Sequence, residues 1–147
     1  MVPPARHARK GKEMRHFDVQ AIEIARPFEG AFRYVADPRN LPEWTHAFVS
    51  VSGGRAMLAT PKGSVEVGLE VRASLEWGIV DWIMTFPDGS VGRAFSRLVP
   101  LDHARTLYSF VLLAPPVPLE QVEGALAEQA KVLTQELAAL QERLARA

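Results

Sequence analysis

Histidine is the side chain best suited to proton transfer near neutral pH, and the chain has four: His7, His16, His46 and His103. No two of them stand three or four residues apart, which is the spacing that a metal site on a helix uses. The sequence also lacks cysteine, so it has neither a thiol nucleophile nor a cysteine ligand for zinc. We therefore expect no metal site and no metal catalysis.

The motifs of three large enzyme classes are missing from the sequence. It contains no Gly-x-Ser-x-Gly, no Gly-x-Gly-x-x-Gly and no phosphate loop that ends in Gly-Lys-Ser or Gly-Lys-Thr. Serine hydrolysis, Rossmann-type cofactors and nucleotide hydrolysis thus lack their signatures, and we expect no cofactor. What remains is acid–base chemistry by single polar side chains, or binding without chemistry.

Three polar side chains are candidates for groups in a binding pocket. His46 follows a predicted short helix, where it is either a base at the mouth of a pocket or an ordinary histidine of a surface loop. Arg93 and Arg97 lie at even spacing on one predicted strand with Phe95 between them, so all three share a face. The two arginines either extend over the outer surface of a sheet or bind an anion or enolate at a charged end of the pocket.

The elements that position these groups belong to one domain. A chain of 147 residues, 48% of them hydrophobic, can bury a sizeable core without a disulfide. Its 17 basic and 17 acidic side chains cancel, whereas nucleic-acid binders usually have a basic excess, so we expect no nucleic-acid partner. No apolar stretch is long enough to span a membrane. We expect residues 1–16 to be a disordered basic tail, residues 17–147 to be one domain, and the protein to be cytoplasmic.

The first part of this domain reads as a strand followed by two short helices. Apolar and polar residues alternate over residues 17–25, which is typical of a strand with one exposed face. Pro27 ends the strand, and residues 28–36 place apolar side chains at helical spacing. Asp37 and the proline after it end this helix and start a second, short one that contains Trp44.

The middle of the chain is a run of strands separated by turns that contain glycine or proline. Alternation is most regular in residues 64–74, which predicts a strand with one buried face. Turn signals recur roughly every ten to twelve residues, which favours short connections and an antiparallel sheet. The strands predicted in this run cover residues 47–52, 55–60, 64–74, 78–86, 90–99 and 105–113.

Residues 119–147 are predicted to form one long amphipathic helix, because they contain no proline and carry leucines at helical spacing. A leucine stripe of this length must be covered, either by the dry face of the sheet or by a second copy of the helix. The leucines from Leu133 onward fit a heptad for fewer than three repeats, so we favour the sheet. The protein is then a monomer or a homodimer.

A six- or seven-stranded antiparallel sheet that twists is too broad for one helix to fill its concave side. We therefore predict an α+β fold in which a curved sheet surrounds the long C-terminal helix and leaves a hollow between them. Large apolar side chains either line this hollow or simply fill the core. The residues predicted to line it are Phe32, Trp44, Trp82, Met84, Phe86 and Tyr108, and a phenol of Tyr34 or Tyr108 could donate to a ligand carbonyl.

One segment resembles a known family. Ile-Glu-Ile at residues 22–24 is followed at residues 27–44 by Pro-Phe-Glu-Gly-Ala-Phe-Arg-Tyr-Val-Ala-Asp-Pro-Arg-Asn-Leu-Pro-Glu-Trp. This strand, helix, Asp-Pro and tryptophan resemble the opening of the SRPBCC superfamily, which includes START-like lipid carriers, pollen-allergen-like proteins and the polyketide cyclase/dehydrase family. The order of elements agrees over residues 17–147, although the later strands carry no diagnostic motif. The resemblance implies a helix-grip fold with a cavity; members bind lipids, hormones or polyketides, and some catalyse cyclisation or dehydration with residues that differ between subfamilies.

Two functions are compatible with these observations. The first is a carrier or sensor that binds a small hydrophobic or aromatic ligand in the hollow. The alternative is a polyketide cyclase/dehydrase-type enzyme, lyase-like and without metal or nucleotide cofactor, in which a His, Asp or Tyr transfers protons. A third interpretation is a dimerisation module built on the last helix. A titratable residue with a perturbed pKa in the pocket would favour the enzyme, and a pocket lined only by carbon would favour the carrier.

Overall fold

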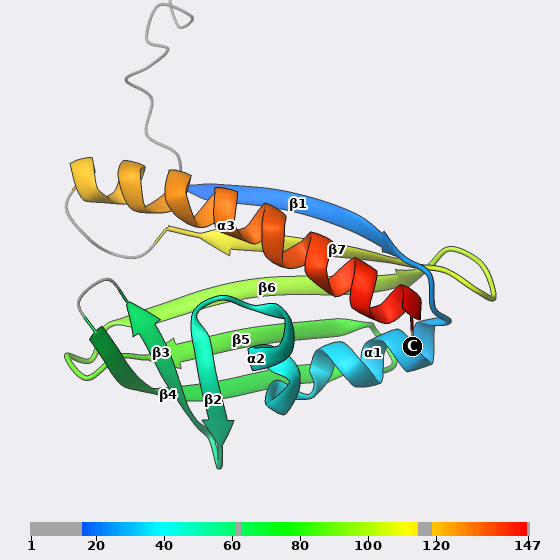
Figure 1. Cartoon of the computed structure of the whole chain (residues 1–147), viewed down its shortest axis with the longest axis horizontal. Coiled ribbons are helices and arrows are strands. Elements are labelled where there is room, and N and C mark those ends of the chain that lie inside the picture. Colours follow the sequence, from blue (N-terminus) through cyan, green and yellow to red (C-terminus); the bar gives the residue numbers. More distant parts are fainter. Residues whose placement is uncertain (1–15, 61–62, 115–118, 147) are drawn as a thin grey trace, which may run out of the picture.

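The computed structural model describes residues 16–60, 63–114 and 119–146, so the predicted tail lies outside the described residues except for His16. Figure 1 shows the order of the elements along the chain. Strand β1 (Phe17–Ile24) is followed by helix α1 (Phe28–Ala36), the short 3-10 helix η2 (Pro38–Asn40) and helix α2 (Leu41–Trp44). The remaining elements are β2 (Phe48–Ser52), β3 (Arg55–Thr60), β4 (Gly63–Ser74), β5 (Ile79–Thr85), β6 (Val91–Pro100), β7 (Thr106–Leu113) and α3 (Leu119–Arg146).

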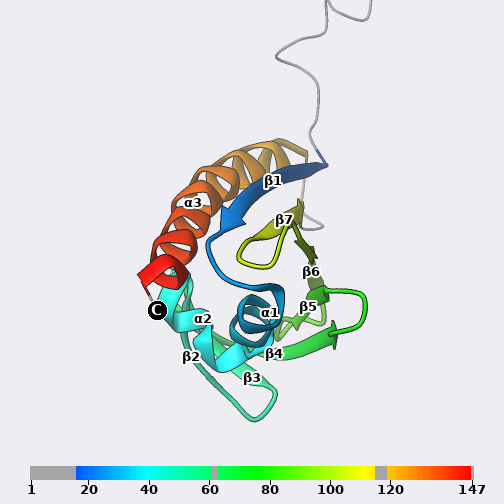
Figure 2. The same cartoon turned by 90° about the vertical axis from the view of Figure 1, so that its right-hand side faces the viewer.

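The described strands form one sheet in the order β1-β7-β6-β5-β4-β3-β2, and every neighbouring pair is antiparallel. Strands β2 to β7 pair in chain order because short turns connect them, and β1 extends the sheet as an edge strand by pairing with β7. Figure 2 shows the sheet curled, with α1 on its concave side. The predicted α+β helix-grip fold is confirmed, with seven strands and with the short helices after the first strand.

Local sequence explains how the short helices begin and end. The Asp37 carboxylate accepts a hydrogen bond from the backbone N–H of Arg39 at 3.0 Å and so caps η2, with Pro38 at its first position. Helix α1 buries Phe32 on the face that it turns to the sheet. Helix α2 has a single turn, and this turn buries Trp44.

The two faces of the sheet differ because side chains alternate along each strand. On β4, Val67 and Leu69 are buried whereas Glu66 and Glu70 are exposed. The same alternation runs through β5 and β6. The buried set faces the concave side and forms one hydrophobic core with the helices, and the exposed set forms the convex face.

Helix α3 covers the concave side and is anchored along β1. Its buried leucines include Leu133, Leu137, Leu140 and Leu144, which belong to the same core as the sheet residues. Polar side chains also join the two elements, since Gln20 of β1 donates to the Ala130 carbonyl oxygen at 3.0 Å and Gln141 of α3 donates to the Glu23 carbonyl oxygen at 2.8 Å. The sheet is thus the partner of the leucine stripe, as the heptad count predicted. None of the described helices has a segment apolar and long enough to span a membrane.

Candidate functional site

Small side chains occupy residues 92–96 of strand β6 on the concave face. Strand β6 presents Gly92, Ala94 and Ser96 to the interior at alternate positions. Trp82 of β5 is opposite Ala94, and Phe110 of β7 is opposite Ser96. Strands β5 and β7 lie on either side of β6 and are therefore about 10 Å apart. The two rings nevertheless stack with centroids 5.6 Å apart, because small β6 side chains leave room above that strand.

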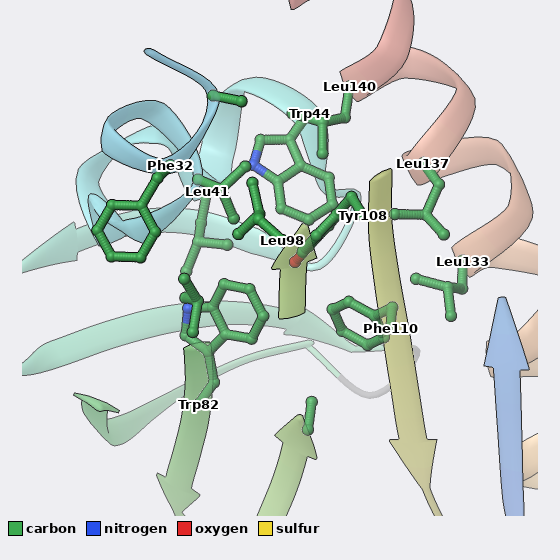
Figure 3. Packing of buried hydrophobic residues seen from close by; sticks show 14 of the residues in the cluster. Phe32, Leu41, Trp44, Trp82, Leu98, Tyr108, Phe110, Leu133, Leu137 and Leu140 are labelled. Carbon is green, nitrogen blue, oxygen red and sulfur yellow. The ribbon is translucent and has the colours of Figure 1, made fainter. Parts of the chain in front are cut away.

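The helices provide the opposite wall of this interior. Trp44 of α2 is 4% exposed, and it belongs to the same hydrophobic cluster as Phe32 of α1 and Leu140 of α3. Figure 3 shows these side chains together with those of the sheet. The interior is therefore apolar and aromatic on both walls, which is the composition typical of a small-molecule site.

The six side chains that we predicted to line a hollow meet in this cluster. Two of them, Met84 and Phe86, are half-buried and reach over Gly92, with atoms 3.5 and 3.4 Å from the place where a Cβ on that glycine would be. The other four are buried within the cluster: Phe32, Trp44, Trp82 and Tyr108. The structure thus brings the six predicted side chains together in one cluster. That they enclose open space for a ligand stays a prediction.

Three polar atoms in this interior have no hydrogen-bond partner among the described residues: Nε1 of Trp44, Nε1 of Trp82 and the hydroxyl oxygen of Tyr108. Burial raises the pKa of the Tyr108 phenol, the interaction of its oxygen with the nearby Ser96 hydroxyl lowers it, and the negative charge of Asp81 raises it further. The phenol therefore stays protonated at neutral pH. The Ser96 hydroxyl donates to the carbonyl oxygen of Val80.

His46 lies where α2 meets α3, with its side chain exposed. Its backbone N–H donates a hydrogen bond to the Glu136 carboxylate at 2.7 Å. Burial raises the pKa of Glu136, and this hydrogen bond and the charge of His46 oppose the shift. Within the described ranges, Glu136 is the carboxyl group whose pKa is raised, so its carboxyl is the best candidate for proton transfer at the edge of the interior.

Tyr34 lies in a second polar cluster that joins the three helices. Its hydroxyl donates to the Glu43 carboxylate at 2.6 Å, and Arg143 of α3 lies 3.6 Å from the same carboxylate. Burial and this carboxylate raise the pKa of Tyr34. The hydroxyl is therefore engaged at the surface, and the arrangement ties α1, α2 and α3 to one another.

Arg93 and Arg97 lie on the convex face. Both are exposed, and they alternate on β6 with Ala94, Ser96 and Leu98, which are buried. The Arg97 guanidinium donates to the Trp77 carbonyl oxygen at 3.1 Å. The two arginines therefore extend over the outer surface of the sheet and do not line a charged end of the pocket. The alternation of side chains along β6 turns them away from the interior.

A hollow of about 470 Å³ lies on the convex side, beside the turn between β5 and β6. It forms where Gly68, which has no side chain, pairs with Arg55 on one side and Thr85 on the other. Arg55 and Glu66 form an ion pair at 2.8 Å across its edge. Phe86, which we predicted for the interior, lines this hollow as well as packing on the core.

No group of three or more His, Asp or Glu side chains in residues 16–60, 63–114 and 119–146 is arranged to hold a metal ion. The side chains described above can bury an apolar ligand, donate hydrogen bonds from indole and phenol groups, and transfer a proton from a carboxyl group at the α2–α3 contact.

Comparisons with solved structures define the class of fold. A START superfamily protein from Mycobacterium smegmatis superposes with a TM-score of 0.64 and 18% identity, covering 90% of this chain and 99% of its own. The Zhui aromatase/cyclase from a Streptomyces species superposes with a TM-score of 0.73 and 12% identity, over 91% of this chain and 95% of its own. A protein from Thermobifida fusca superposes with a TM-score of 0.69 and 17% identity, over 88% of this chain and 93% of its own.

The chain therefore has the START-like, helix-grip fold that these proteins share, as the resemblance to the SRPBCC superfamily implied. At such identities the likeness is one of fold. The sequence matches no family model and no curated protein.

Sequence reasoning missed several residues of the site. Phe110 was not predicted, because the alternation along β7 does not show that its ring reaches Trp82 on β5, beyond the intervening strand β6. Glu136 resembled any other charged residue of an amphipathic helix. The small residues Ala94 and Ser96 were a readable signal, since they stand at alternate positions on a strand whose neighbours carry large rings.

Proposed function

We propose that the protein binds a small hydrophobic or aromatic molecule in the interior between the concave face of the sheet and α3, as a carrier or sensor. The observation that carries this proposal is the ring pair of Trp82 and Phe110 above the small side chains of β6. The pair lies where large side chains from both walls meet, and a flat ligand that displaced one ring would stack on the other.

Burial of apolar surface provides enough free energy for such binding. At about 25 cal/mol per Å² of apolar surface, a ligand that buries a few hundred Å² gains several kcal/mol without any charged contact. Large apolar side chains from β5, β7, α1, α2 and α3 surround the interior, so a ligand there would exchange water for carbon on all sides. The cytoplasmic location, and a monomer or homodimer as the working form, belong to the same proposal.

One observation favours a second function, proton-transfer catalysis of the polyketide cyclase/dehydrase type. The Glu136 carboxyl has a raised pKa and accepts a hydrogen bond from the backbone of His46. A carboxyl group whose pKa is raised keeps its proton to higher pH than an ordinary carboxyl group, as a general acid requires. This function requires the substrate to reach Glu136 from the interior.

The binding proposal is tested by titrating the purified protein with anthracene and following tryptophan fluorescence, together with native mass spectrometry for a molecule that co-purifies. We expect a saturable site of one ligand per chain. The variant Ala94→Leu places a larger side chain beneath the Trp82–Phe110 ring pair and should abolish binding at a stability cost of about 1–3 kcal/mol. Arg93→Leu adds the same side chain to the adjacent position on the convex face and should leave binding unchanged.

The outcome that contradicts the proposal is equally clear. If no molecule co-purifies and the titration shows no saturation, the interior is not a ligand site. If saturation is seen but Ala94→Leu and Arg93→Leu both keep it, the ligand binds elsewhere.

A further inference from the structure

The interior contains polar hydrogen atoms for which the protein provides no acceptor. Trp44 and Trp82 are each 4% exposed and Tyr108 is fully buried, yet neither indole N–H nor the phenol makes a hydrogen bond of good geometry in the described part of the chain. The Ser96 hydroxyl acts on the phenol oxygen without reaching that geometry. Buried polar groups in folded proteins are almost always hydrogen-bonded, because an unpaired one loses its water without compensation. Three such groups in one apolar interior call for an explanation.

All three groups can donate. An indole N–H is a donor only, and the phenol of Tyr108 keeps its proton because burial disfavours its ionised form. Figure 3 shows the Tyr108 hydroxyl pointing toward the side of the interior on which Trp44 and Trp82 lie. A ligand that pairs with these groups must therefore present oxygen or nitrogen atoms that accept hydrogen bonds.

The charge near this interior restricts the class of ligand further, because the Asp81 carboxylate acts on the Tyr108 phenol. Among the described residues, the buried polar side chains are those of Ser96 and Thr106, and neither is ionisable at neutral pH. The Thr106 hydroxyl donates to the Arg26 carbonyl oxygen at 2.9 Å. An anionic group carried to this depth would meet no buried positive side chain among the described residues and would carry a large desolvation penalty. The acceptors must then be neutral.

We propose that the ligand of this interior is a flat apolar molecule with neutral carbonyl or quinone oxygens, and that Trp44, Trp82 and Tyr108 donate hydrogen bonds to those oxygens. This inference rests on the proposed function, since it concerns the same site. Trp44 donates from α2, and Trp82 and Tyr108 donate from the sheet, so the ligand carries acceptors on both of its edges. Its rings lie against Trp82 and Phe110.

The experiment compares two probes with the same ring frame, anthracene and 9,10-anthraquinone, by titration of tryptophan fluorescence. The quinone is the less hydrophobic of the two, so hydrophobicity alone predicts that it binds more weakly. We expect it to bind at least tenfold more tightly, because its two oxygens accept hydrogen bonds that anthracene cannot accept.

Tyr108→Phe removes the hydroxyl and keeps the ring, so the variant should fold. We expect it to weaken anthraquinone binding about tenfold, to leave anthracene binding unchanged and to leave the free protein at least as stable as before, since it removes an unpaired group from the core. Tyr34→Phe is the matched control, because that hydroxyl is engaged at the surface by Glu43. It should change neither affinity.

Each other result has a defined meaning. Equal affinity for the two probes, or an equal loss of both in Tyr108→Phe, overturns this inference while the proposed function stands. A less stable free protein in Tyr108→Phe also overturns it, because the hydroxyl would then have a partner within the protein. If neither probe shows a saturable site, the proposed function itself fails.

Discussion

Trp82 on β5 and Phe110 on β7 stack with ring centroids 5.6 Å apart and an interplanar angle of 27°, although β6 lies between their strands. The contact exists because the side chains of Ala94 and Ser96 on β6 are small. Larger side chains at these two positions of β6 would keep the rings apart. A ligand that enters the interior must therefore compete with this ring pair.

The ring pair predicts a measurable coupling. In a double-mutant cycle with Trp82→Leu and Phe110→Leu, we expect a coupling of about 0.5–1.5 kcal/mol in the free energy of unfolding. Urea denaturation of the four proteins provides the measurement. Additive effects would mean that the rings do not interact in solution.

Trp82 on β5 and Trp77 in the turn before it provide a matched pair that tests the burial of Trp82. Trp82 is 4% exposed and Trp77 is 59% exposed, although they stand five positions apart. We expect Trp82→Ala to lower the free energy of unfolding by about 3–5 kcal/mol. Trp77→Ala should change it by less than about 0.5 kcal/mol. A change near zero for Trp82→Ala would place that side chain outside the core.

Gly78 holds the turn that leads into β5. Its φ is +70°, and a Cβ at this position would collide with the carbonyl oxygen of Leu98. The backbone N–H of Leu98 donates a hydrogen bond to the carbonyl oxygen of Gly78 at 2.7 Å, which holds the two backbones close together. We expect Gly78→Ala to cost at least ~2 kcal/mol more than Gly53→Ala. Gly53 also has a positive φ of 58°, but no atom lies near the position of its Cβ. Equal melting temperatures for the two variants would contradict this description of the turn.

Glu136 predicts a pH-dependent stability. Because burial raises its pKa in the folded protein, the folded state binds this proton more tightly than the unfolded state, so ionisation at neutral pH destabilises the fold. Glu136→Gln keeps an acceptor for the His46 N–H and removes the charge. We expect it to raise the stability at pH 7, and this gain should shrink as the pH falls through the raised pKa.

Urea denaturation at pH 7 and pH 4 measures this effect. The control is Glu142→Gln, an exposed position on the same helix, which should change the free energy of unfolding by less than about 0.5 kcal/mol at either pH. A gain of the same size in Glu136→Gln at both pH values would show that the burial of the carboxylate is not its cause.

Local pattern is sufficient for most of the fold. Helix α1 has the predicted bounds, and β4 begins one residue before the predicted strand, because the alternation of apolar residues and the turn glycines act over a few neighbouring positions. The same alternation decides which face of β6 is buried. The long last helix and its leucine stripe were equally readable.

The candidate site was predictable only in part. Its apolar residues could be named because large side chains on the dry faces of strands and helices must share one interior, and Trp44, Trp82 and Tyr108 are all there. The contacts that give the site its character depend on residues far apart in the chain. Trp82 meets Phe110 over an intervening strand, and Glu136 meets His46 across 90 positions.

Sequence pattern therefore accounts for the elements, for the faces they bury and for the apolar nature of the interior, since these properties follow from short-range periodicity. The curl of the sheet and the position of α3 decided which rings touch, which carboxyl group is desolvated and which donors remain unpaired. These properties depend on distances between atoms that only the packed chain sets, and no local pattern records them.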